Sequence, residues 1–159
     1  MSEAAITTAI ITIACVICAG MLISAIYPAV NRATTSVIST SEKLGEQIET
    51  SIDIIAEANQ SSYEYVWVKN TGSSEIPQIE KSDVFFGKIN DFQRIPFDSS
   101  LSVTPSWNYS IENDDGDGRW DIGETLNITI NSSATLTAGD YYVKVIVYNG
   151  VSDEEKFSI

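Results

Sequence analysis

Residues 4–30 read AAITTAIITIACVICAGMLISAIYPAV, and this stretch decides how the chain is organised. It contains no charged residue and is rich in Ile and Ala. An α-helix of this length rises about 40 Å, which exceeds the roughly 30 Å hydrocarbon core of a membrane. The hydroxyls of Thr7, Thr8 and Thr12 can bond to backbone carbonyls of the same helix, so they do not oppose burial in lipid. The sequence therefore predicts a transmembrane helix over residues 1–30.

A cleaved signal peptide is the alternative interpretation of this apolar segment. The residues Met1-Ser2-Glu3 ahead of it supply no Lys or Arg, whereas a signal peptide begins with a basic region. The apolar stretch is also longer than the core of a typical signal peptide. We therefore expect a retained membrane anchor.

Two cysteines, Cys15 and Cys18, lie inside the apolar segment and are the only ones in the sequence. Their C-x-x-C spacing occurs in redox sites, but such a site needs a partly exposed thiol with a lowered pKa. A thiolate is strongly disfavoured in lipid, so we interpret both residues as small packing groups. The rest of the sequence has no cysteine with which to form a disulfide bond.

Small residues recur at four-residue intervals along the apolar helix, at Gly20 and Ser24 and again at Ala25 and Ala29. Small side chains allow the backbones of two membrane helices to approach closely. This pattern predicts that the helix associates with copies of itself, in a homo-oligomer or a filament.

Residues 31–60 are predicted to continue the helix as a stalk that ends near Ala58. Apolar residues recur along the stalk with a period near 3.5, namely Val30, Val37, Leu44, Ile48 and Ile55. In water this apolar stripe would be exposed. We therefore expect it to pack on a partner helix, on a second copy of the chain or on the chain's own β domain.

The sequence after Ser61 alternates between short β-type runs and turn residues, which is typical of an all-β domain. The dipeptide Asn149-Gly150 is a strong hairpin signal between the last two runs. Seven strands are predicted, over residues 63–69, 82–87, 92–97, 106–112, 125–131, 141–148 and 155–159.

Seven short strands of this kind predict an immunoglobulin-like β-sandwich over residues 61–159, without the disulfide bridge typical of that fold. The fold class is therefore α+β and membrane-anchored: a long N-terminal helix, transmembrane segment plus stalk, followed by the sandwich. One face of the run 141–148 should point into the core, with Tyr141, Val143, Val145 and Val147. We expect the three tryptophans to anchor the core or its loops: Trp67, Trp107 and Trp120.

The chain carries 22 acidic and 9 basic residues, with a formal net charge of −13. Nearly all of the acidic residues follow Arg32. Nucleic acids and anionic lipid surfaces attract clustered Lys and Arg, so neither is expected as a ligand. The acidic region suits a solvated surface, a divalent cation or a basic partner.

Residues 113–124 contain the sharpest chemical motif, Asn-Asp-Asp-Gly-Asp-Gly-Arg-Trp-Asp-Ile-Gly-Glu. Their oxygen-bearing groups have the spacing of an EF-hand calcium loop, and Gly118 falls at its sharp turn. Five side chains and the backbone carbonyl of an arginine make up the predicted site: Asn113, Asp115, Asp117, Arg119, Asp121 and Glu124. Asn in place of Asp at the first position removes one charge and predicts weaker binding. The alternative is an acidic, glycine-rich hairpin without an ion; we expect a structural Ca²⁺ that relieves the repulsion among the carboxylates.

Catalysis has little support in the sequence. There is no histidine, no cysteine outside the apolar segment and no glycine-rich phosphate loop. Ser and Thr are abundant, but no base is present to activate one of them as a nucleophile. We therefore expect a protein that is not an enzyme.

Two opposing signals bear on the orientation in the membrane. Arg32 and Lys43 follow the apolar segment, and the positive-inside rule then favours a cytoplasmic C-terminal region. The acidic, Ser/Thr-rich β region and its calcium loop instead suit the outside of a cell. That region also contains four candidate N-glycosylation sites, at Asn59, Asn108, Asn127 and Asn131. We expect the C-terminal domain to be extracytoplasmic, at the cell surface.

Several phrases of the sequence resemble the archaellum accessory proteins FlaF and FlaG, also called ArlF and ArlG. The long apolar N-terminal helix is followed by VWVKNTG at residues 66–72 and SDVFFG at residues 82–87. The resemblance continues through YVKV at residues 142–145, NGVSD at residues 149–153 and Phe157. It covers nearly the whole chain, and the FlaG-like branch is favoured.

This resemblance implies a membrane anchor and an immunoglobulin-like sandwich in the archaeal pseudoperiplasm. It also implies assembly with the sister FlaF-type accessory protein. Such a protein would form part of the archaellum stator and tie the motor to the S-layer protein. The family offers no short motif from which contact residues could be carried over.

Two other functions remain open at this point. An archaellin or type IV pilin-like filament subunit shares the long helix and the β domain, but its precursor carries a Lys/Arg–Gly processing site, and Ser2-Glu3-Ala4 lacks it. A membrane-anchored adhesin or glycan-binding module would use the same fold and its surface aromatic side chains.

Overall fold

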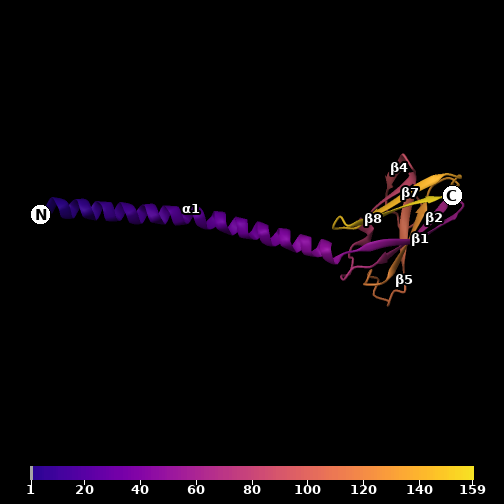
Figure 1. Cartoon of the computed structure of the whole chain (residues 1–159), viewed down its shortest axis with the longest axis horizontal. Helices are drawn as coiled ribbons and strands as arrows, with labels where there is room; N and C mark the ends of the chain where they lie inside the picture. The colour runs from indigo at the N-terminus through magenta and orange to yellow at the C-terminus, as the bar shows by residue number, and fades with distance from the viewer. Residues whose placement is uncertain (1) are drawn as a thin grey trace. The chain divides into compact units, whose positions relative to one another are not determined.

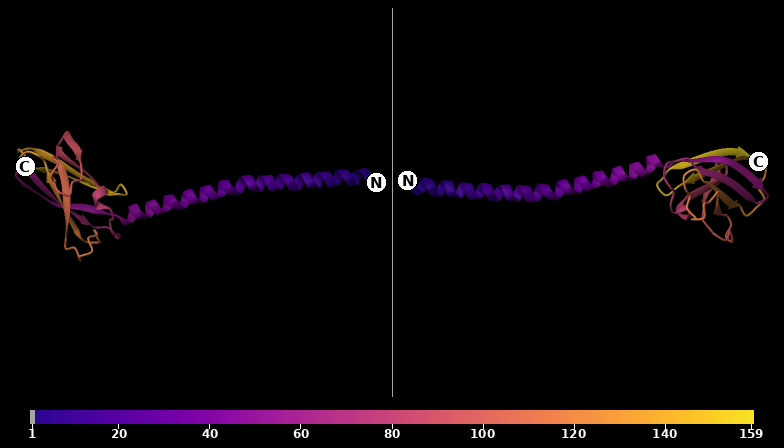
Figure 2. Two further views of the ribbon diagram at one scale, coloured as in Figure 1. Left: turned by 180° about the vertical axis from the view of Figure 1, so that it is seen from behind. Right: turned by 90° about the horizontal axis from the view of Figure 1, so that it is seen from below.

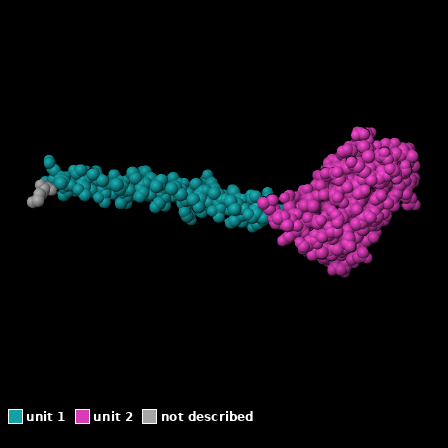
Figure 3. Space-filling view, viewed as in Figure 1, with its two compact units in different colours: residues 1–43 teal, residues 44–159 magenta. Residues whose placement is uncertain are grey.

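The computed structural model describes residues 2–159 (Figure 1). One helix, α1 (Ser2–Glu49), precedes eight β-strands and a short 3-10 helix, Ile79–Lys81. The strands are β1 (Ile52–Gln60), β2 (Tyr63–Asn70), β3 (Asp83–Lys88), β4 (Asp91–Ile95), β5 (Ser106–Glu112), β6 (Thr125–Asn131), β7 (Asp140–Ile146) and β8 (Ser152–Ser158). The chain divides into two compact units, Met1–Lys43 and Leu44–Ile159 (Figure 3).

The first unit consists of helix α1 up to Lys43. Within the described residues, α1 is the one helix long and apolar enough to cross a membrane. The hydroxyls of Thr7, Thr8 and Thr12 donate hydrogen bonds to the carbonyl oxygens of residues four positions earlier, at 2.8–2.9 Å. These three hydroxyls are therefore satisfied inside the helix, as the sequence predicts.

The predicted end of the stalk was wrong. Helix α1 ends at Glu49, and residues 52–60, expected as helix to about Ala58, form strand β1. The sandwich therefore begins at Ile52 and has eight strands. Three β-branched residues, Ile52, Ile54 and Ile55, favour a strand here, and pairing with β2 places Ile52 in the core at 4% exposure. Pairing with strand β2 thus determined the structure of residues 52–60, although Ile48 and Ile55 have a helical spacing.

Polar contacts fasten the last helical turn to the sandwich within the second unit. The Thr50 hydroxyl donates to the carbonyl oxygen of Glu46 at 2.7 Å and accepts from the Asn149 amide at 2.8 Å. The Gln47 amide donates to the carbonyl oxygen of Asn149 at 2.8 Å. The backbone N–H of Ser73 donates to the carbonyl oxygen of Glu49 at 2.8 Å. These bonds satisfy carbonyl groups that the end of a helix leaves free.

The strands form two four-stranded antiparallel sheets, with strand orders β1-β2-β6-β5 and β4-β3-β7-β8 (Figures 1 and 2). The last two strands pair across Asn149-Gly150, so the predicted hairpin is confirmed. Six further predicted strands match β2 to β7 within two residues at each end. The predicted immunoglobulin-like sandwich after a long N-terminal helix is confirmed.

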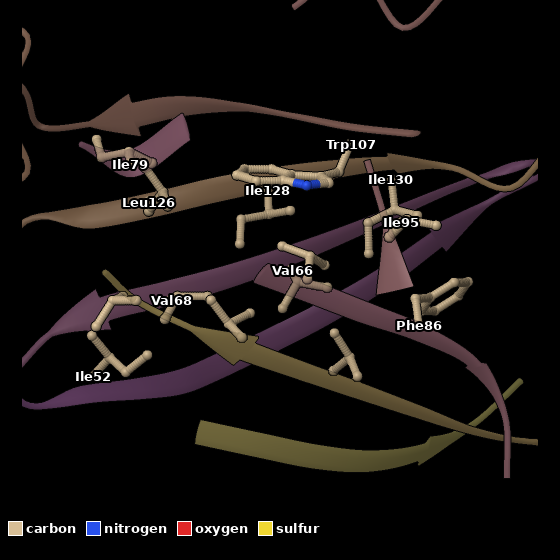
Figure 4. Packing of buried hydrophobic residues seen from close by; sticks show 14 of the residues in the cluster. Ile52, Val66, Val68, Ile79, Phe86, Ile95, Trp107, Leu126, Ile128 and Ile130 are labelled. Carbon is tan, nitrogen blue, oxygen red and sulfur yellow. The ribbon is translucent and has the colours of Figure 1, made fainter. Parts of the chain in front are cut away.

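The core lies between the sheets and follows the two-residue period of the strands. In β7, Tyr141, Val143 and Val145 are at most 3% exposed, and Val147 beyond the strand is 2% exposed, as predicted. Strands β2 and β6 face them with an apolar layer of Val66, Val68, Leu126, Ile128 and Ile130 (Figure 4). Trp107 and Trp120 are buried, whereas Trp67 is half-buried on the outer face and donates to the Glu112 carboxylate at 2.7 Å.

The close approach of Gly72 to the helix end yields a test of this junction. A Cβ at Gly72 would lie 2.5 Å from the carbonyl oxygen of Glu49 and 2.6 Å from the backbone nitrogen of Ser51. We therefore expect Gly72→Ala to lower the free energy of unfolding of the sandwich by about 1–3 kcal/mol, measured by denaturant titration of the full chain in detergent.

Gly45→Ala is the matched control, because an added Cβ there meets no atom within 4 Å. Replacing a helical glycine by alanine should stabilise the chain by up to about 1 kcal/mol. Equal effects of the two substitutions would contradict the junction described above.

Candidate functional site

The connection between β5 and β6 is the acidic loop, residues 113–124, and its second half is fixed to the core. Trp120 is fully buried, and its indole N–H donates to the carbonyl oxygen of Glu124 at 3.2 Å. Asn70 holds both residues from β2: its backbone N–H donates to Glu124 at 2.9 Å and its side-chain amide to Trp120 at 3.2 Å. The loop therefore has a rigid base.

The first half of the loop is exposed, and its carboxylates lie close to those of Asp121 and Glu124 in the second half. Asp115, Asp117 and Asp121 offer oxygens that lie within 4.8 Å of one another, and a second group of this kind joins Asp114, Asp115 and Glu124. The four carboxylates of the predicted site thus fall into two overlapping groups that share Asp115. The structure adds Asp114, which the EF-hand spacing leaves out. The carboxylate of Asp114 turns back into the loop and accepts from the backbone N–H groups of Gly116 and Gly118, at 3.0 and 3.2 Å.

The other two predicted ligands, Asn113 and Arg119, are not carboxylates. Asn113 opens the loop in a left-handed backbone conformation, with φ of 62°. The guanidinium of Arg119 pairs with Glu75 at 2.7 Å and lies 3.8 Å from Asp117. This arginine therefore neutralises part of the charge of the loop, besides offering the backbone carbonyl assigned to it.

The charges of the loop act on one another. Partial burial raises the pKa of Asp121 above its ordinary value, and the neighbouring carboxylates of Asp117, Glu124 and Asp115 raise it further. The carboxylate of Glu124, itself 8% exposed, accepts from the backbone N–H of Asp121 at 2.8 Å. Several hard oxygen groups on a fixed base can hold a divalent cation such as Ca²⁺.

A second unusual carboxylate, Glu64 on β2, was missed by the sequence analysis. Its side chain is fully buried, and among residues 2–159 neither of its oxygens has a hydrogen-bond partner. Burial raises the pKa of Glu64 to about 7; the nearby Asn59 amide opposes this rise and the Glu57 charge adds to it. Strand alternation with Val66 and Val68 was the signal that could have identified an inward-facing Glu64.

Comparison with known proteins identifies the family. The profile of the archaeal-type flagellin family matches residues 2–157. The chain belongs to the archaeal-type flagellin family. An uncharacterized protein of Archaeoglobus fulgidus is 34% identical to it over 99% of both chains.

Solved structures share the fold of this family member. The archaellum periplasmic stator protein FlaG from Sulfolobus acidocaldarius superposes with a TM-score of 0.59 at 23% identity, over 68% of this chain and 99% of its own. A complex of FlaF and FlaG from the same organism superposes with a TM-score of 0.58 at 22% identity. The match covers 67% of this chain and 87% of the solved chain. The flagellin FlaB1 from Methanocaldococcus jannaschii superposes with a TM-score of 0.58 at 12% identity. The match covers 69% of this chain and 89% of FlaB1.

The resemblance to the FlaF/FlaG type of accessory protein, drawn from sequence phrases, is thereby confirmed in family and fold. Membership places the chain among the structural proteins of the archaellum. Membership in an archaeal-type flagellin family is consistent with a structural role, and the absence of enzymatic activity stays a prediction.

The candidate glycosylation sites differ in accessibility. Asn59 is exposed, and Asn108 and Asn127 are half-buried on the strands β5 and β6. Asn131 is only 9% exposed, and its side-chain amide donates to the carbonyl oxygen of Leu101 at 3.4 Å. A glycan on Asn131 would displace packed backbone, so this residue is unsuited as an acceptor in the folded domain.

The residues predicted for helix association, Gly20, Ser24, Ala25 and Ala29, all lie exposed on α1. The Ser24 hydroxyl donates to the carbonyl oxygen of Gly20 at 2.9 Å, which leaves this face free of unsatisfied side-chain donors. Helix association through this face stays a prediction.

The buried Glu64 predicts a specific dependence of stability on pH. Its pKa is about 7 in the folded chain and near the ordinary 4.5 when unfolded, so the folded state binds the additional proton between these values. The contribution of Glu64 to the free energy of unfolding should therefore be highest below pH 4.5 and fall by roughly 3 kcal/mol as the pH rises through 7. Glu64→Gln should abolish this component in denaturant titrations of the full chain.

Glu42→Gln on α1 is the control, since Glu42 is exposed. Its pH profile should run parallel to that of the wild type. A wild-type profile parallel to that of Glu64→Gln would mean that Glu64 does not titrate in this range.

Proposed function

We propose that the chain is a non-enzymatic structural component of the archaellum stator, which anchors the motor to the cell envelope through its β-sandwich. The observation that carries this proposal is the superposition on the stator protein FlaG, which covers 99% of that chain with a TM-score of 0.59. Helix α1 supplies the membrane anchor, since it is long and apolar enough to span the bilayer.

The sandwich faces the outside of the membrane in this proposal, and its surface meets the S-layer protein. FlaG is a periplasmic stator protein, which supports this orientation. The exposed Asn59 sequon and the acidic loop also suit an extracytoplasmic, calcium-rich medium. The proposed partner within the stator is a FlaF-type protein, because FlaF and FlaG have been solved as a complex.

A filament subunit is the second candidate function. The superposition on the flagellin FlaB1, with a TM-score of 0.58, and the flagellin-type family profile both favour it. The two candidates differ in copy number and location. A stator component stays in the membrane fraction in few copies, whereas a filament subunit is the bulk of what is sheared from the cell.

Isolation of the tagged chain from native membranes after mild crosslinking separates the two candidates. We expect a FlaF-type protein, the S-layer protein and archaellum motor components in the isolate. Deletion of the gene should leave filaments on cells that no longer swim. Recovery of the chain as the major protein of sheared filaments would instead establish the subunit.

We further propose that the acidic loop binds a structural Ca²⁺ through Asn113, Asp115, Asp117, Asp121 and Glu124, with the backbone carbonyl of Arg119. The two groups of close carboxylates support this proposal, because an ion would relieve their mutual repulsion. The fixed base at Trp120 supports a role in holding the β5–β6 connection in one conformation.

Thermal unfolding in Ca²⁺ and in chelator tests the ion. A Ca²⁺ concentration 100 times the Kd should stabilise the chain by about 2.7 kcal/mol, seen as a higher Tm. Asp115→Asn should remove this gain, since Asp115 belongs to both carboxylate groups. Asp53→Asn makes the same charge change outside the loop and should retain it. Equal Tm values of the wild type in Ca²⁺ and in chelator would refute the site.

A further inference from the structure

The sandwich has a margin where the edge strands β1 and β8 of the two sheets lie side by side, and we call it the β1/β8 margin (Figures 1 and 2). The two strands share no ladder among the described pairings. They are joined by a bond from the backbone N–H of Ile54 to the carboxylate of Asp153, at 2.7 Å. Backbone pairing therefore does not close the sandwich along this strand pair.

Strand register places two further carboxylates along this margin. Directly opposed residues of an antiparallel pair point to the same face. Glu57 of β1 is opposite Val66, and Glu155 of β8 is opposite Val143. Both valines are fully buried in the core, so Glu57 and Glu155 lie on the inner faces of their sheets, at the exposed rim of the margin.

The buried Glu64 lies behind this rim. It is two residues from Val66 on the inner face of β2, and it is diagonal to Glu57 across the β1–β2 ladder. Its direct partner Asn59 donates to the carbonyl oxygen of Tyr63. Among residues 2–159, no Lys or Arg forms an ion pair with Glu57, Glu64 or Glu155. Strand register thus places three carboxylates on the inner faces of β1, β2 and β8, and none of them has an ion pair within residues 2–159.

Protection of the sheet edge explains only part of this arrangement. Inward-pointing charges on edge strands discourage pairing with another chain, and the exposed Glu57 and Glu155 fit that role. Glu64 is fully buried and cannot repel a strand. A buried carboxyl group without a hydrogen-bond partner costs stability, and an apolar residue would avoid that cost. We therefore expect a ligand from outside the chain to pair with Glu64 and offset this cost.

The chemistry of that ligand follows from charge and spacing. Within residues 2–159, the carboxylates close enough to share one metal ion belong to the acidic loop, and those of the margin are not among them. A long cationic side chain can reach past the rim toward Glu64 and pair with several carboxylates, and a guanidinium does so with two parallel hydrogen bonds. We propose that the β1/β8 margin docks a Lys or Arg side chain of a partner protein.

Docking of a cation here is coupled to the proton of Glu64. The ionisable groups on the inner faces of the surrounding strands are Glu57 on β1, Asp153 and Glu155 on β8, and Tyr141 on β7, while the inner face of β6 is apolar. The one cation on an inner face of the described strands is Lys88 of β3, which lies 5.8 Å from the centre of the Tyr141 ring and donates to the Thr137 hydroxyl at 2.9 Å. Burial and the charge of Glu57 favour the protonated form of Glu64. A cation placed among these carboxylates favours the charged form, so binding releases a proton near neutral pH. This proposal does not depend on the stator function.

Isothermal titration of the full chain in detergent with an arginine-rich peptide tests the proposal. At pH 6.5, the binding enthalpies in buffers of different ionisation enthalpy give the number of protons released. We expect net release in the wild type and none in Glu64→Gln. The double variant Glu57→Gln, Glu155→Gln changes exposed residues only, and it should weaken binding about tenfold.

The double variant Asp114→Asn, Asp115→Asn is the matched control, because it removes the same charge from the acidic loop. It should lower non-specific attraction but leave proton release unchanged. Proton release that persists in Glu64→Gln, or equal weakening by the two double variants, would overturn the proposal. Displacement of the peptide by Ca²⁺ from the loop double variant would also overturn it and would assign a metal ion to the margin.

Discussion

Packing of two four-stranded sheets on one apolar layer is the constraint on which the rest of this structure depends. Strands β2 and β6 supply one side of the layer and β3 and β7 the other, with Val66, Ile128, Val84 and Val143 fully buried between them. The domain contains no cysteine, so no disulfide assists. Burial of apolar surface must therefore offset the conformational entropy that folding removes.

The acidic loop takes its geometry from that layer. Trp120 and Glu124 are held by Asn70 of β2, so the second half of the loop is fixed to the core. The exposed half contains two glycines, Gly116 and Gly118, in left-handed conformations that permit the tight turns. The strands thus force the carboxylates of the loop close together. Their mutual repulsion must be offset by solvent, by Arg119 or by a bound ion.

The same fold serves a stator protein and a filament subunit, since FlaG and FlaB1 superpose on this chain almost equally well. The role of a family member is then carried by its surfaces rather than by its architecture. In this chain the surfaces that stand out are the acidic loop and the β1/β8 margin. Both place carboxylates where the fold leaves them without enough cations, and both lie in the unit that follows Lys43.

Local pattern alone determined the apolar helix, the two-residue alternation of most strands and the acidic loop, because each depends on neighbouring residues and short-range geometry. The tertiary structure decided the helix end at Glu49, where pairing of Ile52 and Ile54 with β2 prevailed over a helical spacing that continued through Ile55. It also decided the burial of Glu64 and the part played by Asp114. The alternation of Glu64 with Val66 and Val68 places the three side chains on one face of the strand, but long-range pairing decides that this face is sealed by the second sheet.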